Sequence, residues 1–190
     1  MQFSAFIVAR ASLLIFLGFY FNSATCQSTY RIDPERSEIT FTIKNMGFTV
    51  DGSFSGLTGK LRFDPENPSD AYFSASLPAK TIDTDNNTRD RHLREEDYFH
   101  VAQYPEISFK STQAISADEG DATYIAIGAL SLRGVKREKR IRFERRQQED
   151  GSYVYEGELQ VNRLNYGIGG ESLMLSNVAT VRIRAVALPE

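Results

Sequence analysis

Apolar and polar side chains alternate along most of this sequence. The pattern is clearest at residues 39–44, 57–63 and 180–185, where every second position is apolar or small. A β-strand has this period of two when one face is buried and the other meets water. Similar stretches, separated by turn residues, lie at 71–79, 106–115, 123–132, 135–144 and 153–163. Roughly eight strands with hairpin-like spacing predict an all-β fold, either a sandwich or a closed antiparallel barrel.

The composition leaves few kinds of catalytic or metal site open. Apolar residues make up 41% of the 190-residue chain and charged residues 25%, as in a folded globular protein. A single cysteine excludes a disulfide framework and a cysteine-rich zinc module. The net charge of −3 provides no field that attracts nucleic acid, so we expect no nucleic-acid partner.

The first 26 residues differ from the rest. Arg10 is their only charge, and an almost wholly apolar run follows at residues 11–21. Small residues then lead to Cys26. A positive start, a short apolar run and a small-residue site are typical of a secretory signal peptide. A membrane-spanning helix would need about 20 apolar residues, more than this run offers. The sequence therefore predicts a leader at 1–26 and one domain at 27–190.

We predict cleavage of the leader after Cys26, which would place the mature chain in the periplasm or outside the cell. Ala24 and Cys26 satisfy the small-x-small rule of an ordinary signal peptidase. A lipoprotein signal would instead have leucine where Ser23 stands. N-terminal sequencing and the intact mass of the processed protein test this prediction. An acylated Cys26 at the mature terminus would contradict it.

One segment, residues 86–97, has the composition of a helix. It is polar, and capping residues stand at its start. In a helix, Arg89, His92 and Leu93 would share one side. The segment has too few apolar residues for a core helix, so we expect a short lid across a barrel end.

The histidines of this region do not predict a metal site or an enzyme. His92 and His100 are eight residues apart, whereas zinc-binding helices place histidines four residues apart. A polar surface cluster explains them better, and we predict no metal ligand. No nucleophile motif is present, so no catalytic residue is predicted either. The enzymatic alternative would use Asp90 and His92 as an acid/base pair.

Seven basic residues lie within 136–146. In a strand, this run gives a charged outer face, which discourages pairing with another sheet edge. The second hypothesis is transient contact with anionic lipid head groups at a membrane surface.

Several segments resemble the YceI-like polyisoprenoid-binding family. The longest is RDRHLREEDYFHVAQYPEISFKS at 89–111. Segments 30–41, 50–64, 128–135 and 165–168 agree in the same order, so the similarity covers residues 30–188. The resemblance implies a lipocalin-like, eight-stranded antiparallel barrel with a helix near its mouth and an elongated apolar cavity. Family members are secreted or periplasmic and hold isoprenoid chains such as quinones or polyprenyl compounds.

The resemblance and the alternation together predict the ligand site. We expect an isoprenoid lipid or quinone inside the barrel, no other cofactor, and a carrier or storage role without enzymatic activity. Arg89 and His92 would lie at the mouth. The inward face of the strands would contact the tail through Ile39, Phe41, Ile43, Leu61, Phe63, Phe73, Phe109, Val181 and Ile183.

Several matters stay open at this point, among them the isoprenoid chain length, the biological pathway and whether the interior is an open cavity or a core filled by side chains. Many relatives have histidine where this chain has Arg36 and Asn45, which leaves the head group undetermined. The sequence also does not define the oligomeric state. An outer-membrane barrel would show similar alternation, but outward residues such as Lys44 and Arg182 would then face hydrocarbon at high cost.

Overall fold

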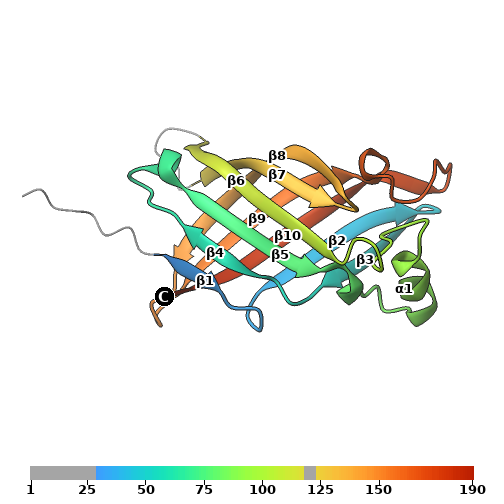
Figure 1. Ribbon diagram of the computed structural model, residues 1–190, viewed down its shortest axis with the longest axis horizontal. Helices are drawn as coiled ribbons and strands as arrows, with labels where there is room; N and C mark the ends of the chain where they lie inside the picture. Colours follow the sequence, from blue (N-terminus) through green and yellow to red (C-terminus); the bar gives the residue numbers. More distant parts are fainter. Residues whose placement is uncertain (1–28, 118–122) are drawn as a thin grey trace, which may run out of the picture.

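The computed structural model describes residues 29–117 and 123–190. The predicted leader, residues 1–26, lies outside the described residues. Within them the chain forms ten strands, one α-helix and three short 3-10 helices (Figure 1). The strands are β1 (Tyr30–Ile32), β2 (Glu38–Asn45), β3 (Phe48–Phe54), β4 (Thr58–Arg62), β5 (Tyr72–Pro78), β6 (Glu106–Ser116), β7 (Thr123–Leu132), β8 (Val135–Gln147), β9 (Tyr153–Asn162) and β10 (Leu175–Pro189). The helices are η1 (Pro68–Asp70), η2 (Ala79–Thr81), α1 (Asn87–Arg94) and η3 (Arg163–Tyr166).

Eight of these strands form a closed antiparallel ring. The hydrogen-bonded order is β1-β4-β5-β6-β7-β8-β9-β10, and β1 also pairs with β10. Strand β10 pairs with β1 through its last residues, 187–189, and with β2 through residues 175–184. Strands β2 and β3 therefore extend the wall toward the α1 end. The predicted eight-stranded antiparallel barrel with a short helical lid segment is confirmed, and the sandwich alternative is wrong.

The ten strands occupy eight positions in the barrel wall, because β1 and β2 share one position and β3 and β4 share another. An interruption of the backbone separates the two strands of each pair. A turn at 33–37, which contains Pro34, separates β1 from β2. Gly56, at a φ of +76°, separates β3 from β4. Proline and a left-handed glycine both break the extended backbone that a continuous ladder requires.

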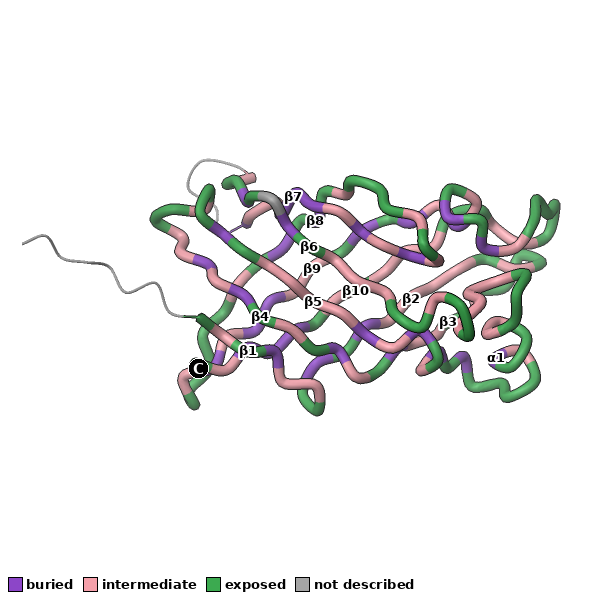
Figure 2. Tube along the Cα trace, viewed as in Figure 1, coloured by how far each residue is buried: buried purple, intermediate pink, exposed green. Residues whose placement is uncertain are grey.

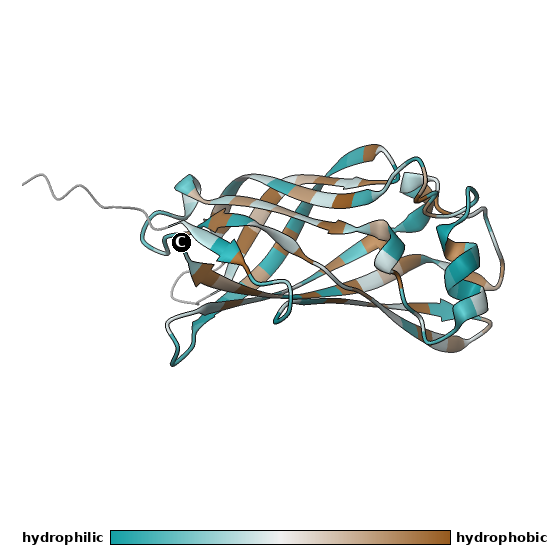
Figure 3. Ribbon diagram, turned by 60° about the horizontal axis from the view of Figure 1, so that its bottom comes forward, coloured by the Kyte–Doolittle hydropathy of each residue, from teal (hydrophilic) through white to brown (hydrophobic). Residues whose placement is uncertain are grey.

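The alternating pattern places apolar side chains inside and charges outside. Figure 2 shows this alternation as changes of colour along the strands, and Figure 3 shows the matching changes of hydropathy. On β10, Arg182 and Arg184 are exposed, while Val181 and Ile183 pack against the core. Cross-strand ion pairs such as Arg182–Glu158, at 3.1 Å, cover part of the outer face.

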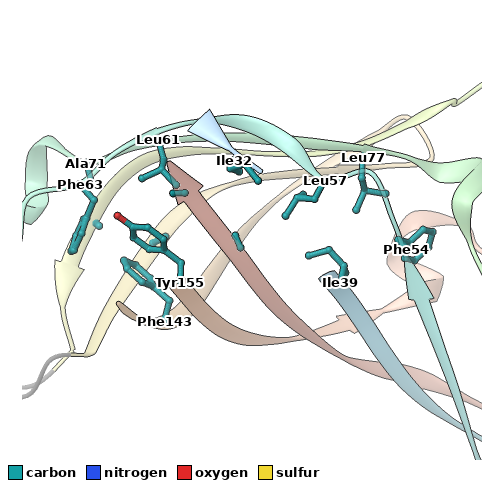
Figure 4. Close-up of a cluster of buried hydrophobic side chains, with 14 of the residues drawn as sticks. Ile32, Ile39, Phe54, Leu57, Leu61, Phe63, Ala71, Leu77, Phe143 and Tyr155 are labelled. Carbon is teal, nitrogen blue, oxygen red and sulfur yellow. The ribbon is translucent and has the colours of Figure 1, made fainter. Parts of the chain in front are cut away.

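An aromatic cluster fills the barrel end opposite α1. The rings of Phe63 and Tyr124 meet edge to face with 4.7 Å between centroids, and Phe63 and Phe143 do so at 5.3 Å. Phe73 and Tyr155 complete the cluster. Figure 4 shows Phe63, Phe143 and Tyr155 close together at one end of the core. Edge-to-face pairs of this kind are favourable beyond the area they bury, so this end is closed by packed rings.

Helix α1 lies at the other end of the barrel (Figure 1). It is shorter than the predicted 86–97 and covers Asn87–Arg94. Asn86 is the N-cap, and its side chain accepts a hydrogen bond from the Arg89 backbone amide at 3.0 Å. None of the helices in 29–117 and 123–190 is long and apolar enough to span a membrane.

At the closed end, Asp150 joins the turn before β2 to the turn before β9. Its carboxylate accepts hydrogen bonds from the hydroxyl and backbone amide of Ser152 and pairs with Arg36 at 2.8 Å. These contacts, the Ser152 hydroxyl first, lower the pKa of Asp150 to about 2. The carboxyl in the unfolded chain has its ordinary, higher pKa, so the folded state binds this proton less readily. The stabilisation is therefore present above the ordinary pKa and is lost as the pH falls through the folded pKa.

We expect Asp150→Asn to remove this part of the acid sensitivity. Between about pH 4 and pH 2, wild-type Tm should fall more steeply than that of the variant, since only wild type takes up this proton on unfolding. Thermal melts followed by circular dichroism at several pH values measure the difference. Parallel Tm curves over this interval would contradict the prediction.

Candidate ligand-binding site

An apolar cavity of about 470 Å³ lies inside the barrel. Side chains from most of the strands line it, together with residues of α1 and of the loop before β10. Its wall is mainly aliphatic and phenyl, with Leu130, Ile141 and Leu159 on the β7–β9 side. Cavities that hold small ligands have about this size and character.

The structure places eight of the nine predicted cavity residues on this wall. They are Ile39, Phe41, Ile43, Leu61, Phe73, Phe109, Val181 and Ile183. Phe63 has the predicted inward orientation but lies in the aromatic cluster, outside the cavity lining. That a ligand contacts these residues stays a prediction.

The cavity opens toward α1. Lining residues toward the closed end, such as Leu61, Phe143 and Tyr155, are buried, apart from Lys60, whose exposed side chain is paired with Glu190. Lining residues at the α1 end keep contact with solvent: Asn45 is half-buried and His92 is exposed. We call this end the mouth.

Arg89 and His92 lie at the mouth, and both line the cavity. The Arg89 guanidinium donates to the Thr84 hydroxyl at 2.7 Å and to the Thr84 carbonyl at 2.6 Å. The His92 ring meets Tyr98 edge to face, with 4.9 Å between centroids. The bonds to Thr84 give Arg89 the role of fixing α1 over the mouth. Head-group contact by either residue stays a prediction.

We expect Arg89→Ala to cost about 1.5–3 kcal/mol of unfolding free energy, because hydrogen bonds from a charged donor are worth that much when partly buried. Arg91→Ala is the matched control, since Arg91 is exposed on the same helix and should change stability by less than about 0.5 kcal/mol. Urea unfolding of both variants measures the effect. Equal stabilities of the two variants would contradict this role for Arg89.

The geometry does not bring Asp90 and His92 together as an acid/base pair. Asp90 is buried, and its Oδ1 accepts hydrogen bonds from the Thr84 amide and hydroxyl. His92, two residues further along the helix, is exposed beside Tyr98. Asp90 therefore holds the start of the lid segment. Across 29–117 and 123–190, no three histidine, cysteine, aspartate or glutamate side chains converge as metal ligands would.

Sequence reasoning missed Arg163, a buried cation on the cavity wall. Its guanidinium donates to five acceptors in the loop before β10 and in the first residues of β10, and no carboxylate is among them. The acceptors are the carbonyls of Ile168, Gly170, Leu175 and Ser176 and the Asn177 side-chain oxygen. Hydrogen bonds from Arg163 therefore hold the loop before β10 in its conformation at the mouth.

The Tyr155 hydroxyl is a polar group at the deep end of the cavity. The side chain is buried, and its oxygen has no hydrogen-bond partner within the described part of the chain. Burial raises the pKa of Tyr155, and the nearby Arg145 guanidinium opposes this effect only in part. The phenol is therefore neutral at physiological pH.

A small antiparallel barrel that encloses one apolar cavity, closed at one end and open at the other, defines the class of lipocalin-like cavity barrels. The chain belongs to the YceI-like family, since the model of the YceI-like domain matches residues 30–187. The resemblance inferred from the sequence is confirmed.

Comparison with known proteins agrees with this assignment. A UPF0312 protein of Photorhabdus laumondii is 34% identical over 116 residues, which are 60% of this chain and 59% of that protein. The chain thus spans less than two thirds of the length of the curated relatives it matches.

Several solved structures share the fold. Burkholderia cenocepacia BcnA has a TM-score of 0.77 at 18% identity, covering 83% of this chain and 99% of that chain. A polyisoprenoid binding domain from Saccharophagus degradans has a TM-score of 0.67 at 12% identity, covering 85% and 98%.

Proposed function

We propose that this protein binds the tail of an isoprenoid lipid, a quinone or a polyprenyl compound, in the barrel cavity. The observation that carries the proposal is the apolar cavity of about 470 Å³, closed by aromatic rings at one end. Family membership and the similarity of fold to a polyisoprenoid binding domain support the choice of ligand class.

The physical basis is burial of apolar surface. Each 100 Å² of tail removed from water contributes about 2.5 kcal/mol. The cavity wall is already formed, so little of this energy is spent on ordering the protein. The head group would lie at the mouth, beside His92 and Tyr98, because the opposite end is filled by the aromatic cluster. The tail would extend inward past Val181 toward Phe73.

The proposed role is that of a carrier or storage protein in the periplasm or outside the cell. An isoprenoid tail is insoluble in water and crosses an aqueous compartment only when shielded. The predicted leader at residues 1–26 supports this location. We propose binding without catalysis, because Asp90 is engaged by Thr84 and is not paired with His92.

Mass spectrometry of lipids extracted from the protein purified from its native host tests the proposal. We expect an isoprenoid lipid in stoichiometric amount. A second experiment is a titration of the delipidated protein with quinones of increasing tail length. The affinity for the quinone should rise with the length of its tail. Absence of an extracted apolar ligand together with no binding of any added quinone would refute the proposal.

A further inference from the structure

Large apolar side chains are exposed at the mouth. Met46, on the turn between β2 and β3, and Phe48, the first residue of β3, are 63% and 75% exposed. Leu173 and Met174, in the loop before β10, are fully exposed and 61% exposed. We call these four residues the apolar rim. Elsewhere in the described chain, Val178 is exposed at the same end, and Tyr72 and Ile115 are exposed nearer the closed end.

The apolar rim is one continuous feature, although it comes from distant parts of the sequence. The Met46 amide donates to the Met174 carbonyl at 2.8 Å, which fixes the two loops side by side. Figure 1 shows both at the α1 end of the barrel. Asn45 and Leu175, the neighbours of rim residues in the chain, line the cavity. The rim therefore borders the opening through which an apolar tail would pass.

The backbone beneath the rim indicates that its side chains do not serve folding. Met46 and Gly47 connect β2 to β3 with φ angles of +52° and +80°. A two-residue turn with both φ angles positive strongly favours Asn-Gly or Gly-Gly, and a methionine in its first position is strained. This chain places an exposed apolar side chain there. A strained backbone that carries an exposed apolar group points to a role outside the fold.

The start of β8 adds positive charge at the same end. Lys136, Arg137, Lys139 and Arg140 form no ion pair with another residue in 29–117 or 123–190. Arg137 donates to the Asn165 carbonyl at 2.8 Å, in η3, which leads into the loop that carries Leu173. Further along the same strand, Arg146 is paired with Glu144 and Glu156. Arg145, next to it, lies over the Tyr153 ring at 4.4 Å instead of pairing with a carboxylate of the described chain. The start of β8, with four cations and the single carboxylate of Glu138, therefore carries net positive charge near the mouth.

We propose that the apolar rim inserts into the surface of a phospholipid bilayer, with the basic start of β8 against anionic head groups. The inference deepens the proposed function and rests on it, because an isoprenoid tail resides in a bilayer and must enter the cavity there. Four side chains on two loop tips match shallow insertion into the interface. A stable protein partner would require a contiguous surface of about 20–30 residues.

The test is flotation of the host-processed protein, with its N-terminus established, on vesicles of phosphatidylethanolamine and phosphatidylglycerol. Wild type should float with the vesicles. The rim variant Phe48→Ser/Leu173→Ser should bind at least about tenfold less, since two apolar side chains no longer leave water. The matched control Tyr72→Ser/Ile115→Ser removes exposed apolar groups away from the mouth and should float like wild type.

Three outcomes would overturn the proposal: no flotation of wild type, equal flotation of wild type and rim variant, or equal loss in the control. Sedimentation velocity of the same proteins tests a fourth such outcome. If wild type does not bind vesicles but forms a dimer that only the rim variant loses, the rim contacts a second copy of the chain. Flotation needs no cargo. A failure of the isoprenoid proposal therefore appears in the lipid extraction and quinone titration, separately from this result.

Discussion

Val181→Trp is expected to lower the isoprenoid retained by the purified protein at least about tenfold, a loss of about 1.4 kcal/mol in binding free energy. Val181 lies on β10 opposite Phe41 of β2 and Leu159 of β9, and all three line the cavity. An indole at this position would cross the path of the tail between the mouth and the aromatic cluster. Because the new ring enters open space, the fold should lose no more than the usual overpacking cost of about 1–3 kcal/mol.

Thr180→Trp is the matched control for this prediction. Thr180 precedes Val181 on the same strand and does not line the cavity, so the same enlargement is made on the other face. Mass spectrometry of co-purified lipid and a quinone titration are compared for both variants, with melting curves to establish folding. A folded Val181→Trp protein that retains as much lipid as wild type would show that the tail does not occupy this cavity.

Arg163→Met is expected to cost about 3–5 kcal/mol of unfolding free energy, the range of the largest single-residue effects. The substitution keeps an extended side chain but leaves five acceptors around the loop before β10 without their donor. The Ile168 carbonyl is buried and the other four hydrogen bonds are partly buried, so the acceptors that lose this donor are desolvated without a partner. Arg163→Lys keeps the charge but cannot reach all five acceptors, so it should lie between Met and wild type.

Arg182→Met is the control for Arg163→Met, because it measures the loss of unfolding free energy when an exposed arginine is replaced by methionine. Arg182 is an exposed arginine of β10 whose ion pair with Glu158 lies on the outer face. Exposed pairs contribute at most about 1 kcal/mol. Urea unfolding of the three variants gives the comparison. If Arg163→Met is no less stable than Arg182→Met, the five hydrogen bonds do not hold the loop as described.

The alternation of side chains was sufficient to predict the barrel wall. A period of two is a local property of the sequence. It determines which face of a strand is apolar, whatever the strand's position in the sheet. For this reason the inward orientation of Val181 and Ile183 could be predicted before their partners on β2 and β9 were known. The position of a residue along the barrel axis depends on register, which is not local. Phe63 therefore has the predicted orientation but belongs to the aromatic cluster and not to the cavity.

The mouth was harder to predict, because its residues come from loops. Arg163 is a single cation between two stretches of ordinary composition, and only the fold brings its five acceptors around it. The apolar rim gave a weak signal: Met46 before Gly47 is an unusual residue for a tight turn, but the sequence does not reveal that Met174 lies beside it. The helix at 86–97 was predicted from its polarity and its cap, since both act within a few residues.

Closure of the ring has a consequence for the order in which the chain folds. The last ladder of the barrel joins Tyr30–Ile32 to the end of β10, residues 187–189, so it forms only after β10 has been synthesised. Contacts this distant in sequence make folding slow, as in other β-rich topologies. The entropy of closing so long a loop grows only by about 0.6 kcal/mol for each doubling of its length, so the delay affects the rate of folding more than the final stability. Until that step, β1 and the end of β10 present open edges, and the nascent barrel has no closed wall around its interior.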